Sequence, residues 1–421
     1  MTASLAALLM AGCSQNEVTE ISPDTHPQMM FGAYTGTSTR GVDTTNDSMK
    51  NDPSAADKYG GFGIMGYFTG SKTWDEVKTS TAPGFMYNQM VKWDGTLNEN
   101  KGGWTYTPIK YWPNNSNDKI SFFAYAPYEN NGTSGTKTGV KVCDATTKGI
   151  PYIEFTLKEE KDLPKMVDLV VAQKLDQTYA STSSTSNKIN FKFDHILSRV
   201  SFKAKLGDGN FGDMDGDKSF VYITEMWIVG KNHGTSKADG NLSLLNPAAE
   251  SNTNSKFYTT AQWKNLRWDY TNAVIPDKDF DLKSMLDTKT SITESNPTTG
   301  HSATISGVKI DKNAQTTPVS LFPENQYLYL IPIGEMEEKQ DTGCGEGEIK
   351  IGFHYDIVTK SETTSGEYIA SHAESVISIP IGHLKRKTTY EYTLIINLHA
   401  IEIGNAEVTP WGDEVETSPV V

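Results

Sequence analysis

The feature that most constrains the fold of this chain is its succession of short apolar runs, each bounded by turn-forming residues. Such runs include GFGIMGYF (61–68), KISFFAYAPY (119–128), SRVSFKAKL (198–206) and IKIGFHYDIV (349–358). They are rich in aromatic and β-branched residues, as β-strands are, and helical periodicity sustained over three turns is hard to find. The sequence therefore predicts a mainly β fold.

The most regular strand pattern lies near the C-terminus, in TTYEYTLIINLHA (388–400). Apolar residues at alternate positions share one face, and the Thr and Glu residues between them share the other, as in a strand buried on one side. The apolar character continues into the residues that follow this strand, at Ile401, Ile403, Val408 and Trp411.

The chain has 421 residues, more than one sandwich core usually organises, so we expect two domains. The Ser/Thr-rich segment TYASTSSTSNK (178–188) has no apolar anchors and is the best linker candidate. We therefore expect an N-terminal β-sandwich over residues 41–186 and a C-terminal β-sandwich over residues 187–421.

The formal net charge of -14 indicates an acidic surface, which excludes nucleic acid as an expected partner. Basic residues form no run longer than the one at 385–387. The chain also lacks the sequence context of a nucleophile with its base, so we expect no enzyme and no cofactor.

The first residues, MTASLAALLMAG, form an apolar stretch too short to span a bilayer, and Cys13 follows directly. The order LMAGC resembles a bacterial lipobox, in which the cysteine becomes the lipidated first residue of the mature protein. We expect residues 1–13 to be a lipoprotein signal peptide and the lipid-modification machinery to be a partner. The alternative is an ordinary buried cysteine after a cleaved signal.

Two other patterns favour packing over chemistry. Cys143 and Cys344 form no CxxC pair and lie in different expected domains, so no metal or redox site is expected and their pairing is left open. Trp93, Trp104 and Trp112 are close enough in sequence for a sugar-stacking platform, but such aromatics are more often core or hairpin pairs. His195 is read as structural.

Several segments together resemble the fimbrillin family, the subunits of the type V pili of Bacteroidales. They are the lipobox at Cys13, MMFGAYT followed by TSTRG, WTYTPIKYWPNNSNDKISFFAYAPY, NFKFDHILSRVSF, LFPENQYLYLIPI and AEVTPWGD. The resemblance implies an all-β fold of two tandem transthyretin-like Greek-key β-sandwich domains.

The resemblance also implies how such a subunit assembles. Residues 14–40 would be a tether and a removable first β-strand, which completes the N-terminal sandwich until an arginine-specific protease cuts after Arg40. Gly41 would become the new N-terminus, and the apolar groove would accept a strand from residues 387–421 of a neighbouring fimbrillin subunit. The donor side chains would be Ile401, Ile403, Val408 and Trp411. The alternative is that this segment closes its own C-terminal sandwich.

We therefore expect a structural subunit, of the stalk type, of a type V pilus that serves adhesion or biofilm formation. It would be an outer-membrane lipoprotein precursor that becomes part of an extracellular pilus, with a host surface or glycans as further partners. A tip adhesin or an anchor subunit of the same pilus is the nearest alternative. A glycan-binding surface lipoprotein of tandem sandwiches is a second class.

Overall fold

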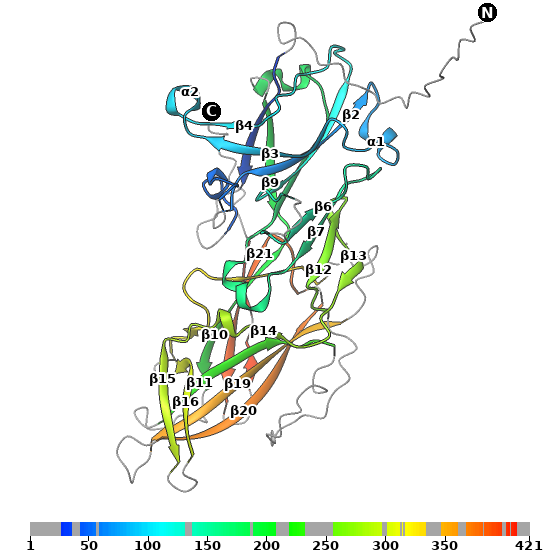
Figure 1. Cartoon of the computed structure of the whole chain (residues 1–421). Helices are drawn as coiled ribbons and strands as arrows, with labels where there is room; N and C mark the ends of the chain where they lie inside the picture. The colour runs from blue at the N-terminus through cyan, green and yellow to red at the C-terminus, as the bar shows by residue number, and fades with distance from the viewer. Residues whose placement is uncertain are drawn as a thin grey trace, which may run out of the picture.

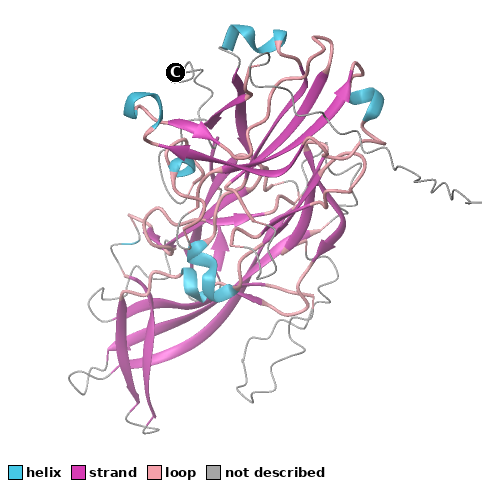
Figure 2. Cartoon of the chain, turned by 45° about the horizontal axis from the view of Figure 1, so that its top comes forward, coloured by secondary structure: helices cyan, strands magenta, loops and turns pink. Residues whose placement is uncertain are grey.

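The computed structural model describes most of the chain between residues 27 and 410. The described ranges are 27–35, 43–55, 59–130, 137–185, 188–207, 219–231, 256–296, 301–311, 314, 316–333, 347–360, 368–381, 383–397, 401–404 and 406–410. Strands run through the whole molecule, which is elongated, and the helical turns lie at its periphery (Figure 2). In these ranges no helix has the length and apolarity needed to cross a membrane. The prediction of an all-β fold is confirmed.

The helical turns are three to six residues long and lie in the connections between strands. They are α1 (Trp74–Val77), α2 (Leu97–Asn100), η1 (Ser48–Lys50), η2 (Glu160–Lys165), η3 (Ala180–Thr185) and η4 (Lys283–Met285).

A seven-stranded sheet forms the N-terminal end of the molecule, in the order β1-β9-β8-β5-β2-β3-β4 (Figure 1). Its strands are β1 (Met30–Thr35), β2 (Phe62–Gly70), β3 (Met86–Asp94), β4 (Gly103–Thr105), β5 (Lys119–Ala126), β8 (Val170–Gln177) and β9 (Lys188–His195). Gly63 of β2 has to be a glycine for the sheet to pack, because a Cβ there would lie 2.4 Å from the Tyr125 ring. In this strand order, β1 lies at one edge of the sheet.

A four-stranded sheet lies in the middle of the molecule and combines strands from both halves of the sequence, in the order β13-β12-β7-β6 (Figure 1). Its strands are β6 (Val140–Val142), β7 (Tyr152–Thr156), β12 (Thr260–Lys264) and β13 (Arg267–Val274). β7 pairs with β12 in antiparallel register, from Tyr152 opposite Lys264 to Thr156 opposite Thr260. The two halves of the chain are therefore joined by strand pairing.

The domain boundary expected between residues 186 and 187 does not coincide with a division between sheets in the structure. It falls between β8 and β9, which pair with each other in the N-terminal sheet, where β9 also pairs with β1. The physical reason is the apolar alternation of β9, which buries Ile189, Phe191 and Phe193 in the same core as β2 and β5. The Ser/Thr-rich segment before β9 forms η3.

Two six-stranded sheets form the other end of the molecule and pack face to face. One has β10 (Ser198–Leu206), β17 (Val319–Ser320), β18 (Leu328–Leu330), β21 (Thr388–Ile396), β22 (Ile401–Ile403) and β23 (Glu407–Pro410). The other has β11 (Ser219–Ile228), β14 (Phe280–Asp281), β15 (Thr290–Asn296), β16 (His301–Ile310), β19 (Glu348–Lys360) and β20 (Tyr368–Pro380). Phe202 of the first sheet packs against Phe353 of the second, with ring centroids 6.2 Å apart.

The buried side chains form two main clusters. One fills the concave side of the seven-stranded sheet and includes Met29 and Phe31 from the region of β1. The other runs from the opposite face of this sheet, through the four-stranded sheet, into the C-terminal sandwich. The transthyretin-like Greek-key description of the two sandwiches stays a prediction.

Candidate strand-exchange site at the edge of the N-terminal sheet

β1 occupies a slot between β9 and the segment that precedes Trp112. It pairs with β9 in parallel over its whole length, from Met30 opposite Lys188 to Thr35 opposite Phe193. On its other side, Met29 N donates to Lys110 O at 2.9 Å and Trp112 N donates to Pro27 O at 3.2 Å. The strand is therefore held by backbone hydrogen bonds along one edge and near its start on the other.

The inward face of β1 is anchored in the N-terminal core. Met29 and Thr35 are fully buried and Phe31 is 4% exposed, whereas Met30, which points the other way, is 37% exposed. The Phe31 ring lies 5.2 Å from Tyr106, 5.7 Å from Phe122 and 6.0 Å from Phe191, measured between centroids. Burying Met29 and Phe31 contributes roughly 1.5–3 kcal/mol each, so β1 fills a groove that its removal would open to water.

Tyr106 fastens the start of β1. Its hydroxyl donates to Met29 O at 3.0 Å and accepts a hydrogen bond from Lys110 N at 3.2 Å. Burial raises the pKa of Tyr106 to about 12, so the hydroxyl keeps its proton and remains a donor at neutral pH.

We expect Tyr106→Phe to loosen β1 without unfolding the sheet. Of the two hydrogen bonds lost, the one to Met29 O holds β1 directly, and its loss costs about 0.5–1.5 kcal/mol, which corresponds to roughly two- to tenfold more frequent opening of the strand. Hydrogen exchange of the peptide covering residues 27–35, followed by mass spectrometry, measures this change. The control is Tyr111→Phe, because the described residues show no hydrogen bond to that hydroxyl. Equal exchange in both variants would contradict the assignment.

The chain that follows β1 is anchored by a buried polar network between the two halves of the molecule. Arg199 on β10 forms an ion pair with Asp43, which also accepts a hydrogen bond from the Tyr329 hydroxyl at 2.8 Å. Arg199 donates to Thr389 Oγ1 on β21 at 2.8 Å. Asp43 therefore connects the segment after the expected cut to Arg199 on β10 and, through Arg199, to the parallel strand β21.

The next residue, Thr44, anchors the same segment to the end of the N-terminal sheet. Its backbone N donates to Asp168 Oδ2 at 3.2 Å, and its hydroxyl donates to Asp168 O at 2.8 Å. Asp168 Oδ2 also lies 2.7 Å from Nδ1 of His195, which confirms the structural reading of that histidine. Burial raises the pKa of Asp168, and the adjacent His195 opposes this shift.

Arg40 and Gly41, the expected cleavage position, lie in residues 36–42, outside the described residues. So does the expected lipidation site Cys13. Sequence reasoning missed Asp43, Asp168 and Arg199, although the placement of Arg199 in the apolar run around it was a signal that this charge is buried and paired.

The expected donor segment pairs with β21 within its own chain. Ile401 and Ile403 of β22 lie opposite Ile396 and Leu394, and Val408 of β23 lies opposite Tyr390. Val408 is 54% exposed, and every residue of β23 is exposed. Trp411 lies outside the described residues. β23 therefore contributes backbone pairing to its sheet but buries little side-chain surface there.

Comparison with known proteins shows the family of this chain. A family model described as fimbrillin-like matches residues 60–411. The chain belongs to the fimbrillin-like family. The fimbrium subunit Fim1C of Phocaeicola vulgatus is 30% identical over 407 residues, which cover 95% of this chain and 92% of the relative. The crystal structure of a fimbrial protein from Bacteroides vulgatus is 26% identical, with a TM-score of 0.66, and the match covers 91% of this chain and 100% of that one. The resemblance inferred from the residues is confirmed.

The three tryptophans considered for a stacking platform, Trp93, Trp104 and Trp112, do not form an exposed one. Trp112 is fully buried, and the Trp93 and Trp104 rings meet edge to face at an interplanar angle of 77°. Trp104 also packs against Phe62 of the core at 5.0 Å. Their reading as core and hairpin pairs is confirmed, so these residues do not favour glycan binding.

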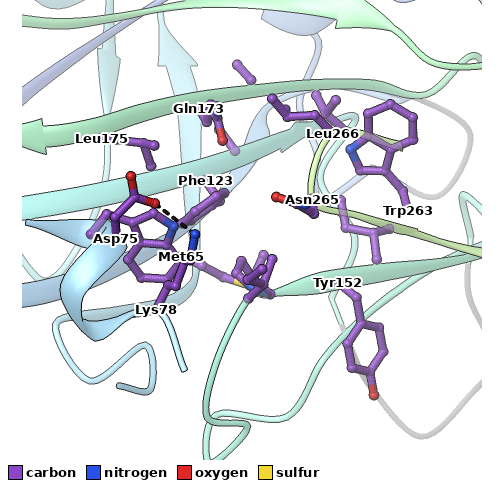
Figure 3. Close-up of a pocket in the computed structure, with 17 residues that line it drawn as sticks. Met65, Asp75, Lys78, Phe123, Tyr152, Gln173, Leu175, Trp263, Asn265 and Leu266 are labelled. Atoms are coloured by element: carbon purple, nitrogen blue, oxygen red, sulfur yellow. Dashed lines mark hydrogen bonds and ion pairs between the residues drawn. The ribbon is translucent and has the colours of Figure 1, made fainter. Parts of the chain in front are cut away.

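A cavity of about 120 Å³ lies between the seven-stranded and four-stranded sheets of the fimbrillin (Figure 3). Its lining is mostly apolar, and its two charged residues, Asp75 and Lys78, form an ion pair with each other at 2.9 Å. The residues that line it include no Ser, Thr, Cys or His. Cys143 is buried and free, and burial raises the pKa of its thiol.

Proposed function

We propose that this fimbrillin is a structural subunit of a surface fimbria that assembles by strand exchange after proteolysis between β1 and Asp43. Arg40 would be the residue before the cut and Gly41 the new N-terminus. The released β1 would leave a groove in the N-terminal sheet, and the C-terminal segment of a second subunit would fill it.

The observation that carries this proposal is the position of β1. It is an edge strand whose inward side chains, Met29 and Phe31, fill an aromatic groove. Its covalent link to the body of the chain that follows runs through residues 36–42. The residues that follow have anchors besides β1, because Asp43 pairs with Arg199 and Thr44 with Asp168. Asn46 Oδ1 also accepts a hydrogen bond from Thr35 N of β1 at 2.7 Å. A cut before Asp43 would therefore release β1 and leave the new N-terminus in place.

Energetics explain why proteolysis must come first. An incoming strand restores backbone hydrogen bonds worth about 0.5–1.5 kcal/mol each and buries large apolar side chains worth roughly 1.5–3 kcal/mol each. These gains must exceed an ordering cost of about 1–2 kcal/mol per residue. Because β1 is part of the same chain, its effective concentration is on the order of millimolar, and a strand from another molecule cannot compete with it.

The C-terminal segment suits the donor role. β22 and β23 form the outer edge of their sheet, and the exposed Val408 buries little surface there. Ile401, Ile403, Val408 and Trp411 would provide the groove-filling side chains. Release of the exposed β23 would cost few apolar contacts, whereas release of β22 would give up the packing of Ile403 against the core. Retention of the segment on its own β21, as in the isolated chain, is the competing state.

Within the pilus we assign the subunit to the stalk, because it has both a removable strand and a candidate donor. The precursor would be a lipoprotein of the outer membrane, lipidated at Cys13, and the assembled form would be extracellular. A tip subunit would lack a working donor, and an anchor subunit would keep β1 and its lipid. This role requires no catalytic group.

Treatment of the purified precursor with an arginine-specific protease tests the proposal. We expect a single early cut after Arg40, loss of the fragment that contains β1, and growth of polymers detected by light scattering. Arg40→Gln is the matched control and should remain intact at this position and monomeric. A chain that is cut after Arg40, loses β1 and still stays monomeric at high concentration would overturn the proposed assembly.

A further inference from the structure

A group of histidines and carboxylates gathers on one face of the C-terminal sheet, on β11, β19 and β20. The pairing register places Asp356 opposite His372, and His354 opposite both Glu225 and Glu374. Residues directly opposite each other in antiparallel strands point to the same face, as do residues two apart in one strand. Two histidines and three carboxylates therefore share one small area of a rigid three-stranded surface.

Three side chains of this group place their donor atoms close enough together to hold one metal ion. Nδ1 of His372 lies 2.6 Å and Nε2 of His354 lies 3.8 Å from Oδ1 of Asp356. One donor atom from each of these three residues lies within 4.8 Å of the other two. Asp356 is 4% exposed, so it is held at the base of the cluster, whereas the His372 side chain is 55% exposed and leaves access from solvent.

A carboxylate lies near the second ring nitrogen of His354. With Nε2 of His354 directed at Asp356, its Nδ1 lies 4.0 Å from Oε2 of Glu225. Metal-binding histidines usually turn their second ring nitrogen toward a carboxylate, which sets the orientation of the ring. Glu225 is in turn held by Lys283, whose ammonium lies 3.4 Å from Oε1.

We propose that His354 Nε2, Asp356 and His372 Nδ1 bind a divalent transition-metal cation of the zinc class. Two imidazoles with one carboxylate favour Zn²⁺ over Mg²⁺ or Ca²⁺, which prefer ligand sets made only of oxygen. On binding, the hydrogen bond between His372 Nδ1 and Asp356 is replaced by one bond from each of them to the metal, and His372 binds as the neutral imidazole that keeps its single proton on Nε2. A proton is released to solvent only from a ring that was doubly protonated beforehand. The remaining coordination position is open to water or to a group from another molecule.

The three ligands of this site lie on β19 and β20, and none lies on β1 or on the expected donor strands, although β20 contacts β22. β19 and β20 lie at the end of the molecule opposite the N-terminal sheet (Figure 1), and neither strand contacts β1 in the described structure. The metal would join β19 to β20 across their hairpin. Failure of metal binding would leave the assembly proposal unaffected, and the reverse also holds.

Titration of the untagged, metal-free protein with Zn²⁺, followed by calorimetry, tests this inference. We expect one tight equivalent per chain and a higher melting temperature in Zn²⁺. His372→Gln should weaken the binding by at least about 100-fold, since even loss of a supporting residue costs about 10- to 100-fold. Binding should also weaken at about pH 5, because the ligating nitrogens must be unprotonated.

The matched control is His383→Gln, which removes an exposed histidine outside the cluster and should bind Zn²⁺ as the unmodified chain does. Asp356→Asn is a second variant, and circular dichroism shows whether it folds. His372→Gln is the decisive variant because its side chain is exposed and its loss should not affect folding. No tight Zn²⁺ in the unmodified chain, or equal affinity in His372→Gln and His383→Gln, would overturn the proposed site.

Discussion

A complex of two subunits, and nothing longer, is expected when two complementary forms of this fimbrillin are mixed. The first form is cut after Arg40 and ends at Ala400, so that its groove is empty and it has no donor segment. The second form is the full chain with Arg40→Gln, so that β1 fills its groove and its donor is intact. Each form alone should stay monomeric, and size-exclusion chromatography with light scattering measures the mixture.

The physical reason is that each form carries one half of the exchange. Several side chains of the donor, each worth roughly 1.5–3 kcal/mol when buried, should hold the complex together on the column. The donor must first leave β21, where β23 buries little side-chain surface. Growth stops at two subunits because β1 fills the groove of the second form and the first form has no donor segment.

The control for this experiment is the Arg40→Gln chain shortened to end at Ala400. It has neither an empty groove nor a donor and should form no complex with the first form. A complex with this control would place the donor elsewhere in the chain. A lack of complex with the full-length partner would favour the alternative that β22 and β23 only close their own sheet.

Asp43→Ala is expected to lower the free energy of unfolding by about 3–5 kcal/mol. The substitution leaves the Arg199 guanidinium buried without its carboxylate partner, and it removes the acceptor of the Tyr329 hydroxyl. The Asp43 side chain is 1% exposed and that of Arg199 is 11% exposed, so water cannot replace the lost partner without a rearrangement. Urea unfolding of the precursor, monitored by tryptophan fluorescence, measures the loss.

Asp47→Ala is the matched control, because its carboxylate is 92% exposed and pairs only with the side chain of Lys50 at the surface. Its effect should stay within about 0.5 kcal/mol, as for most surface substitutions. Similar stability of the two variants would show that the buried network does not anchor the segment after the expected cut.

Much of the local structure could be predicted from the residues. The run GFGIMGYF forms most of β2, as its apolar character predicted, with Gly63 beneath Tyr125 and Gly66 beside Phe85. The alternation in TTYEYTLII appears as β21, with Tyr390, Tyr392 and Leu394 buried on one face. Such assignments hold because strand alternation depends only on neighbouring residues.

The candidate sites could be predicted only in part. The first strand was found from its sequence, but the partners that hold it, Tyr106 and β9, depend on folding. His354, Asp356 and His372 had no sequence signature, because two residues of β19 and one of β20 come together only through the register of a long hairpin. The expected absence of a metal site rested on sequence spacing, which does not report proximity across a sheet.

The sequence by itself determined that this chain is built from strands, which residues of each strand face inward, and to which family it belongs. Only the tertiary structure decided that β9 stays in the N-terminal sheet, that β7 pairs with β12, and that Asp43 meets Arg199. Alternation of apolar residues is a property of a few consecutive side chains. Strand partners and buried ion pairs are chosen by competition among segments that lie far apart along the chain.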